Sequence, residues 1–165
     1  MVSVVSVVGR SNVGKTTFVE KLIRELKRRG YSVGTIKHYR HEFEIDQPGK
    51  DSWRHAHAGS DVAVIASPTK LALVRRLDRE QTIDEIVASM PRVDIVVTEG
   101  YKHEGKPKIE VFRQAVVSEL VSDPSELLAL VTDQRLDLSV PQFDLEDAAG
   151  VADLIERALL KSGES

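Results

Sequence analysis

A loop near the start of the chain places the strongest constraint on its fold. The stretch "GRSNVGKTT" (residues 9–17) matches G-x-x-x-x-G-K-[ST] at every fixed position. Residues 2–8 before it are mostly valine, which is typical of a buried parallel strand, and residues 16–29 after it carry apolar side chains at helical spacing. This order predicts a phosphate-binding loop rather than a chance match in a glycine turn. Backbone N–H groups would surround the phosphates, Lys15 would reach their β- and γ-oxygens, and Thr16 could ligate Mg²⁺.

The remaining pattern alternates between strands and helices. It predicts further strands over residues 32–38, 61–67, 71–76, 93–100, 108–113 and 127–133, and helices over 52–58, 82–90 and 145–160. Asp51, a capping box from Thr82 to Glu85, and Asp144 would begin the three helices. The second and third of these strands are joined by a Ser-Pro-Thr-Lys turn and predict a hairpin. We therefore expect an α/β fold of the P-loop NTPase type in one domain (1–165), with a mostly parallel sheet flanked by helices and an inserted antiparallel hairpin.

Composition narrows the classes of function. The 165 residues are 41% apolar and 30% charged, which is typical of one globular domain. A net charge of −3 and few aromatic residues argue against nucleic acid as a partner. The absence of cysteine excludes disulfides and thiolate metal sites. No basic signal-peptide region opens the chain and no apolar run approaches the ~20 residues of a membrane span, so we expect a cytoplasmic protein with no membrane partner.

A second carboxylate usually completes the metal site of a P-loop protein. Glu99 ends the apolar strand "DIVVTE", at the edge where parallel sheets bind ligands, whereas Asp94 begins that strand and should face the opposite edge. We therefore favour Glu99, with Gly100 letting the backbone approach a γ-phosphate, over a solvated strand end. Lys37 and Lys102 lie at or after strand ends and could add positive charge over an anionic ligand, or be ordinary surface lysines.

The loop "DQPGKDS" (residues 46–52) follows the second predicted strand. It contains D-x-x-G, a pattern that GTPases use near the γ-phosphate, but Pro-Gly is also the usual signature of a type II turn. Its place after that strand makes Asp46, Lys50 and Asp51 candidates for contact with metal or phosphate. A turn followed by a helix cap is the alternative.

The base-binding residues are less clearly marked. The guanine-reading motif N-K-x-D is absent, because Asn12 is the only asparagine in the chain. Asp133 ends the strand "LLALVTD", where such a reader would fall, and could accept from guanine N1 and N2 or be a simple strand-end aspartate.

Five histidines raise the hypothesis of a metal site. Because His55 and His57 would point to different faces of a helix, solvated or locally bonded histidines are favoured.

Four segments together resemble the family of molybdopterin-guanine dinucleotide biosynthesis adapter proteins, MobB. They are "GRSNVGKTT", "VGTIKHYRHEFEIDQPGKDSWRHAHAGS", "DIVVTEGYKHEGKPKIEVFR" and "ALVTD". The resemblance implies a GTP-binding protein with weak GTPase activity. It would assist a MobA-type nucleotidyltransferase in attaching GMP to molybdopterin or in delivering the guanine dinucleotide. The resemblance also implies a homodimer in which edge strands join into a larger sheet.

The residue patterns and the resemblance together point to a GTP and Mg²⁺ site. The candidate nucleotide-binding residues are Gly9, Asn12, Val13, Gly14, Lys15, Thr16, Thr17, Asp46, Lys50, Gly100 and Asp133, and the candidate metal ligands are Thr16 and Glu99. Residues 10–13 are bulkier than the small residues common in the family, so the phosphate cradle could differ in detail. No arginine finger or catalytic glutamine is identified, which agrees with slow turnover. A P-loop small-molecule kinase and a GTP-dependent metallochaperone are the alternative functions.

Overall fold

The computed structural model describes residues 2–39 and 41–161, which group into two compact units. The first contains the described chain up to His38 and from Ser89 onward, and the second spans Tyr39–Ala88. The elements of the first are β1 (Ser3–Val8), α1 (Lys15–Arg28), β2 (Val33–Lys37), β5 (Ile95–Glu99), β6 (Lys108–Phe112), η1 (Pro124–Glu126), β7 (Leu127–Thr132), β8 (Gln142–Phe143), α4 (Ala148–Ile155) and η2 (Glu156–Leu160). Those of the second are α2 (Asp51–His57), β3 (Val62–Ala66), β4 (Leu71–Arg75) and α3 (Ile83–Ala88).

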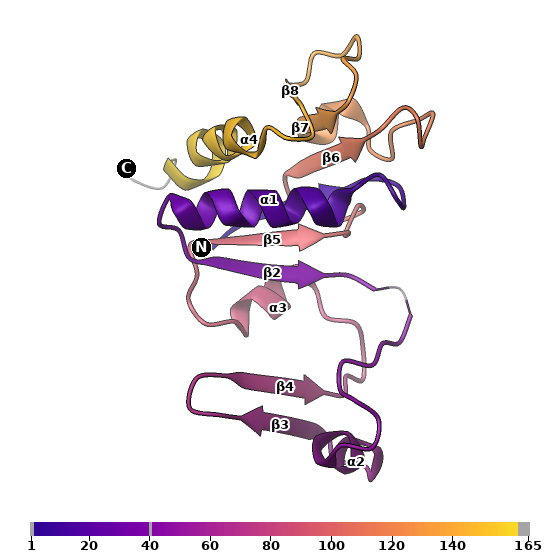
Figure 1. Ribbon diagram of the computed structural model, residues 1–165, viewed down its shortest axis with the longest axis vertical. Helices are drawn as coiled ribbons and strands as arrows, with labels where there is room; N and C mark the ends of the chain where they lie inside the picture. Colours follow the sequence, from indigo (N-terminus) through magenta and orange to yellow (C-terminus); the bar gives the residue numbers. More distant parts are fainter. Residues whose placement is uncertain (1, 40, 162–165) are drawn as a thin grey trace. The chain divides into compact units, whose positions relative to one another are not determined.

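The first unit is built on a six-stranded sheet in the order β2-β5-β1-β6-β7-β8 (Figure 1). All neighbouring strands in it are parallel. Their carboxyl ends therefore lie along one edge, with the central strand β1 leading into the P-loop. The expected α/β fold, with a mostly parallel sheet, flanking helices and a separate antiparallel hairpin, is confirmed.

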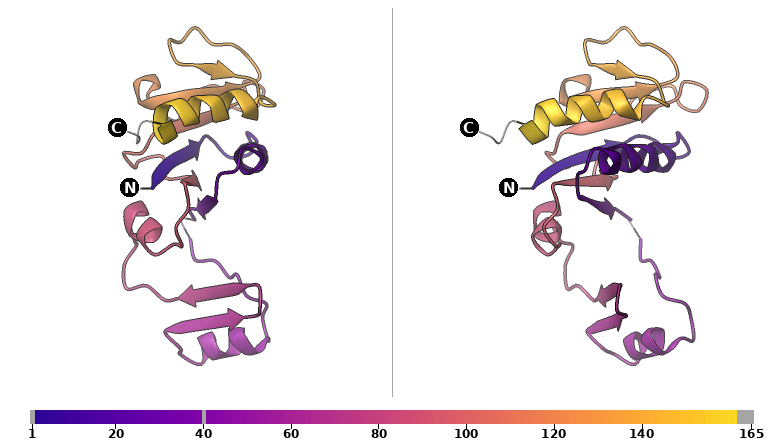
Figure 2. Two further views of the ribbon diagram at one scale, coloured as in Figure 1. Left: turned by 90° about the vertical axis from the view of Figure 1, so that its left-hand side faces the viewer. Right: turned by 60° about the vertical axis from the view of Figure 1, so that its left-hand side comes forward.

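Helices α1 and α4 pack side by side on one face of this sheet (Figure 2). The buried face of α1 consists of Phe18, Val19, Leu22 and Leu26, at the helical spacing seen in the sequence. They meet alternate residues of the central strands, such as Val5 and Val7 of β1. At the other face, Phe112, Leu127 and Leu130 are covered by apolar residues of the connecting segments.

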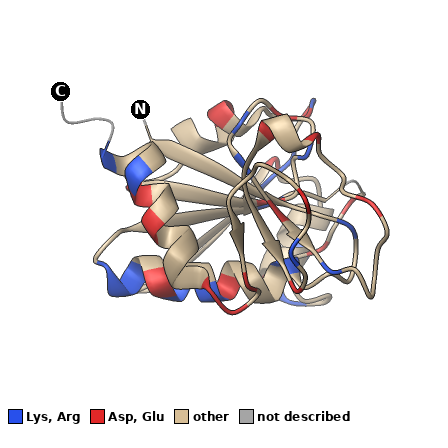
Figure 3. Cartoon of the chain, turned by 90° about the horizontal axis from the view of Figure 1, so that it is seen from above, with Lys and Arg blue, Asp and Glu red and all other residues tan. Residues whose placement is uncertain are grey.

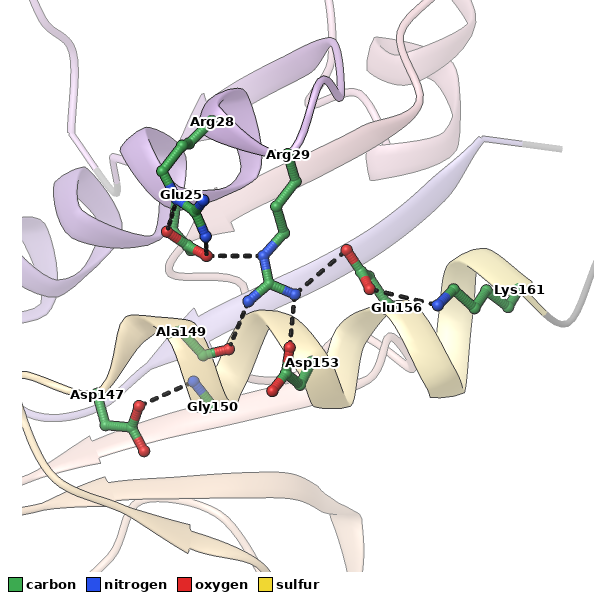
Figure 4. Close-up of polar contacts among 9 residues, drawn as sticks. All are labelled: Glu25, Arg28, Arg29, Asp147, Ala149, Gly150, Asp153, Glu156 and Lys161. Atoms are coloured by element: carbon green, nitrogen blue, oxygen red, sulfur yellow. Dashed lines mark hydrogen bonds and ion pairs between the residues drawn. The ribbon is translucent and has the colours of Figure 1, made fainter.

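An arginine at the end of α1 fixes it to α4 (Figure 4). The Arg29 guanidinium lies 2.7 Å from Glu25, 2.6 Å from Asp153 and 3.2 Å from Glu156, and it donates to the Ala149 carbonyl at 3.0 Å. Hydrogen bonds from Arg28 and Arg29 lower the pKa of Glu25 to about 2. The network fixes the position of α1 and therefore of the loop that precedes it.

Strands β3 and β4 of the second unit form an antiparallel hairpin, as expected. Its turn is closed by a hydrogen bond from Ser67 N to Lys70 O at 2.8 Å. Apolar residues lie on both faces of this two-stranded sheet, and Val64, Leu71 and Leu73 are each at least half exposed. The hairpin therefore leaves much of its apolar surface uncovered within the chain.

Two expectations for the C-terminal region are wrong. The helix begins at Ala148 and not at Leu145, because Asp147, and not Asp144, accepts a hydrogen bond from an N–H of the first turn, that of Gly150. Asp144 instead accepts from the backbone N–H of Glu146, which makes a separate turn. Strand β8 was not predicted. None of the described helices is long and apolar enough to cross a membrane.

Charged side chains lie mainly on helices and loops, while the strands are largely uncharged (Figure 3). In the strands of the six-stranded sheet, all of which are described, only Lys37, Glu99, Lys108 and Glu110 carry charge. Lys37 and Glu99 are the last residues of β2 and β5. The carboxyl edge beside the P-loop therefore holds two opposite charges on the neighbouring strands β2 and β5.

Candidate functional site: the phosphate loop and Glu99

The P-loop takes a backbone path that depends on left-handed residues. Gly9, Asn12 and Gly14 have φ of 139°, 66° and 96°. A Cβ at Gly9 would lie 2.4 Å from the carbonyl oxygen of Val111 in β6, so this position has no room for a side chain. Asparagine tolerates the left-handed region better than most residues, which explains how Asn12 takes this conformation. Successive turns of this kind favour concave anion-binding backbones.

Helix α1 begins directly after Gly14 and presents an unblocked N-terminus. Gly14 provides no capping side chain, and the first turn contains no acidic residue. The first N–H groups of a helix have no partner within it, so an anion is a natural partner for them. Thr16 and Thr17 are exposed in this turn, whereas the side chain of Val13 is fully buried in the core beneath the loop. Val13 therefore anchors the loop, and only its backbone can face a ligand.

The Lys15 side chain turns back over the P-loop. Its ammonium donates to the Arg10 carbonyl at 2.7 Å. Burial lowers the pKa of Lys15, the nearby Glu99 carboxylate opposes that effect, and the charge of Lys37 adds to it. The ammonium thus lies within the electrostatic influence of both charges at the sheet edge.

Thr16 and Glu99 come into direct contact. The Thr16 hydroxyl lies 2.9 Å and 3.0 Å from the two carboxylate oxygens of Glu99, whose side chain is only 14% exposed. Asp94, the rejected alternative, lies at the opposite edge, where it accepts from Ser32 N and Oγ at 2.7 Å each. A hydroxyl and a carboxylate side by side are the hard oxygen donors that suit Mg²⁺. These two residues therefore fit the expected metal.

The residues after Glu99 form a strained turn. Gly100 and Tyr101 have φ of 105° and 56°, and a non-glycine residue in this region is uncommon. A Cβ at Gly100 would lie 3.1 Å from that of His38, and the Tyr101 ring stacks on the His38 ring at 4.4 Å. Gly100 is therefore required by local geometry, whereas its approach to a γ-phosphate remains a prediction.

Asp46 and Lys50 belong to the second unit and contact their own loop. Asp46 accepts from Gln47 N at 2.8 Å, and Lys50 N donates to Gln47 O at 3.1 Å. With Gly49 at φ 85°, this is the type II turn that Pro-Gly predicts. Helix α2 follows it, with Lys50 and not Asp51 at the N-cap. Contact of this loop with a nucleotide remains a prediction.

Asp133 follows β7 at the carboxyl edge of the sheet. It accepts from Gln114 N at 3.3 Å and lies 3.7 Å from the Arg113 guanidinium, so it is tied to the segment after β6. Its side chain is 32% exposed. The position is compatible with a base reader, and that role also remains a prediction.

The sequence did not identify Glu110 as a buried acidic residue. Glu110 in β6 is 1% exposed and accepts from Val121 N at 2.7 Å and Ser122 N at 3.0 Å. Burial raises the pKa of Glu110, and the two N–H groups oppose that effect. It holds the segment after β6 against the sheet. A charged residue inside the apolar run "KIEVF" was the available signal.

Two of the five histidines, His38 and His57, have local aromatic partners in the structure. His57 donates its Nδ1–H to the Trp53 carbonyl at 2.9 Å, and its ring stacks on the Trp53 ring at 3.7 Å. Across residues 2–39 and 41–161, no three His, Asp or Glu side chains gather in a group that could hold a metal ion.

Comparisons with known proteins agree with this architecture. The family model described as "Molybdopterin guanine dinucleotide synthesis protein B" matches residues 4–133. The molybdopterin-guanine dinucleotide biosynthesis adapter protein of Haemophilus influenzae is 34% identical over 160 residues, which cover 96% of this chain and 90% of that protein. The Escherichia coli protein of the same name is 35% identical over 162 residues, covering 94% and 92%.

Solved structures give the same assignment. The crystal structure of Bacillus subtilis MobB has a TM-score of 0.76 at 27% identity, covering 95% of this chain and 98% of that one. A crystal structure of a molybdopterin-guanine biosynthesis protein B has a TM-score of 0.72 at 30% identity, covering 93% and 98%. The chain therefore belongs to the MobB family of molybdopterin guanine dinucleotide synthesis proteins.

Proposed function

We propose that this chain is a GTP-binding adapter in molybdopterin-guanine dinucleotide biosynthesis, with Mg²⁺ as its metal ion and slow GTP hydrolysis as its chemistry. The observation that carries the proposal is the contact of Thr16 with Glu99 beside a complete P-loop. The relatives in Haemophilus influenzae and Escherichia coli are named adapter proteins of this biosynthesis, and that supports the choice of pathway.

Different groups of the first unit would bind the phosphates and the metal ion. The loop backbone and the N-terminus of α1 would bind phosphate oxygens, and Lys15 would exchange its bond to the Arg10 carbonyl for the β- and γ-phosphates. Thr16 and Glu99 would hold Mg²⁺, which when bound neutralises charge on those phosphates. Asp133 is the candidate for hydrogen bonds to guanine. Asp46 and Lys50 are kept as candidate nucleotide-binding residues.

Membership of the family supports a proposal for the partners. A MobA-type nucleotidyltransferase would be the enzyme that this adapter assists, and molybdopterin or its guanine dinucleotide would be the cargo. We also propose a homodimer, which the exposed apolar hairpin β3–β4 supports.

Lys15→Ala tests the phosphate site. Because its hydrogen bond is to a carbonyl of the exposed loop, the substitution should leave the fold intact. Charge-assisted hydrogen bonds contribute roughly 1.5–3 kcal/mol, so GTP affinity should fall by at least about tenfold. Titration calorimetry with GTP and with ATP, each with Mg²⁺, measures this, and circular dichroism checks folding.

Lys27→Ala, an exposed lysine in the last turn of the same helix, is the matched control and should bind GTP normally. Normal GTP affinity in Lys15→Ala would contradict the phosphate-site assignment. Adding the wild-type chain to a MobA-type enzyme should raise guanylation of molybdopterin. No effect on guanylation, together with ATP-dependent phosphorylation of an acceptor, would favour the small-molecule kinase.

A further inference from the structure

A row of three register partners crosses the sheet beside the P-loop. Val7 of β1 pairs with Glu99 of β5, and Glu99 pairs with Lys37 of β2. Directly paired residues of parallel neighbours point to the same face of a sheet. Because Val7 belongs to the core beneath α1, Glu99 and Lys37 also face the side of α1. The arrowheads of β2 and β5 end at one edge, near the start of α1 (Figure 1).

The side chains confirm what the register implies. The Lys37 ammonium lies 3.5 Å from Glu99 Oε1, and Glu99 also contacts the Thr16 hydroxyl. Lys37 is 48% exposed, so its flexible end can move without unpacking the core. Thr16 directly follows the phosphate-binding Lys15. A cation that touches the Thr16–Glu99 pair is therefore within a few ångströms of the place where the terminal phosphate of a bound nucleotide would lie.

This position has the chemistry that the site otherwise lacks. Phosphoryl transfer needs positive charge beyond that of the P-loop lysine and the metal, and in many P-loop proteins an arginine supplies it. No such arginine was identified in the sequence. We propose that Lys37 is a catalytic residue of the GTP hydrolysis proposed above, contacting the γ-phosphate oxygens through its ammonium group.

In the step that Lys37 assists, the oxygen of a water molecule forms a bond to the γ-phosphorus. The bond from that phosphorus to the β,γ-bridging oxygen breaks, and its electron pair stays on the departing GDP. The two protons of the water pass to inorganic phosphate and to solvent. Lys37 keeps its own proton and stabilises the negative charge that spreads over the transferring group.

The test compares Lys37→Met, Lys37→Arg and the control Lys27→Met with the wild-type chain. Three affinities are measured with Mg²⁺: for GDP, for the non-hydrolysable β,γ-imido analogue of GTP, and for GDP with aluminium fluoride, which mimics the transferring phosphoryl group. GTP turnover is measured in parallel. GDP has no γ-phosphate, so the loss of a group that contacts only the γ-phosphate should leave GDP affinity within about twofold of the wild type.

Lys37→Met should lower kcat by about 100- to 1,000-fold, the range for removal of one preorganised donor, and should weaken the aluminium fluoride complex more than the GTP analogue. Lys37→Arg, which keeps the charge, should recover most of both losses, and Lys27→Met should match the wild type. Equal weakening of all three ligands in Lys37→Met would show a general binding role and overturn the proposal.

The proposal rests on GTP binding, and the same measurements separate the two. If the wild-type chain binds and hydrolyses GTP while Lys37→Met does so equally well, Lys37 has no catalytic role and the proposed function stands. If the wild-type chain binds neither GDP nor the GTP analogue, the proposed function fails, and this inference fails with it.

Discussion

At the scale of single residues, Gly9 directly follows β1, at a point where a side chain would collide with the neighbouring strand β6. In Gly9→Ala the Cβ would meet the Val111 carbonyl at 2.4 Å, and φ of 139° is strained for any residue with a side chain. Strain of this kind costs roughly 1–3 kcal/mol, so the denaturation midpoint should fall and GTP affinity should fall with it. Gly105→Ala is the control, because a Cβ there would meet nothing within 4 Å. Equal midpoints for the two variants would contradict the proposed crowding at Gly9.

At the scale of helices and strands, the contact between α1 and α4 should depend on pH through Glu25. Its pKa is held at about 2 by Arg28 and Arg29, below the usual 4.5. A depressed carboxyl pKa stabilises the folded state fully above about pH 4.5, and that stabilisation is lost as pH falls toward 2. Wild type should therefore be more stable than Glu25→Gln at pH 7, and the difference should shrink between pH 4.5 and 2. Urea denaturation at several pH values measures this, and a difference that does not vary with pH would exclude the mechanism.

Elements with local signals were predictable from the sequence. Thr82 and Glu85 form the expected reciprocal capping box at α3, with Thr82 N donating to Glu85 at 2.9 Å and Glu85 N donating to Thr82 Oγ1 at 3.2 Å. Gly49 takes the positive φ that a Pro-Gly turn requires. The apolar strands were also found, because each is a continuous run bounded by polar or turn residues. In these cases the residues that decide the structure are within a few positions of one another.

Features set by distant contacts were missed. Asp144 and Asp147 are both suitable N-cap residues in sequence, and the structure uses Asp147 for the helix and Asp144 for the turn before it. Glu110 could not be recognised as a buried acceptor, since its donors are eleven and twelve residues away. Lys37 was open to two interpretations until the register placed it opposite Glu99. The contact between Thr16 and Glu99 was predictable, because parallel strands must end at a common edge.

At the scale of the whole molecule, the hairpin β3–β4 exposes apolar surface that a second protein chain could cover. An isolated two-stranded sheet is marginally stable in water, and each strand of this one has an edge that β3–β4 pairing leaves unfilled. Leu71 and Leu73 of β4 are 70% and 56% exposed. A second copy of the chain would supply strands of matching pattern, which agrees with the homodimer that the family resemblance implies.

Leu73→Glu should therefore weaken the dimer, because a buried unpaired carboxylate in the joined sheet would have to be desolvated. Analytical ultracentrifugation across a concentration series should show a dimeric wild type and a variant shifted toward monomer by at least about tenfold in dissociation constant, equivalent to ~1.4 kcal/mol. Val116→Glu makes the same change at an exposed valine of the first unit and should remain dimeric. A monomeric wild type, or a Leu73→Glu dimer as tight as the wild type, would rule out the hairpin as the interface. GTP affinity should be unchanged in Leu73→Glu, because every residue of the phosphate loop and Glu99 comes from one chain.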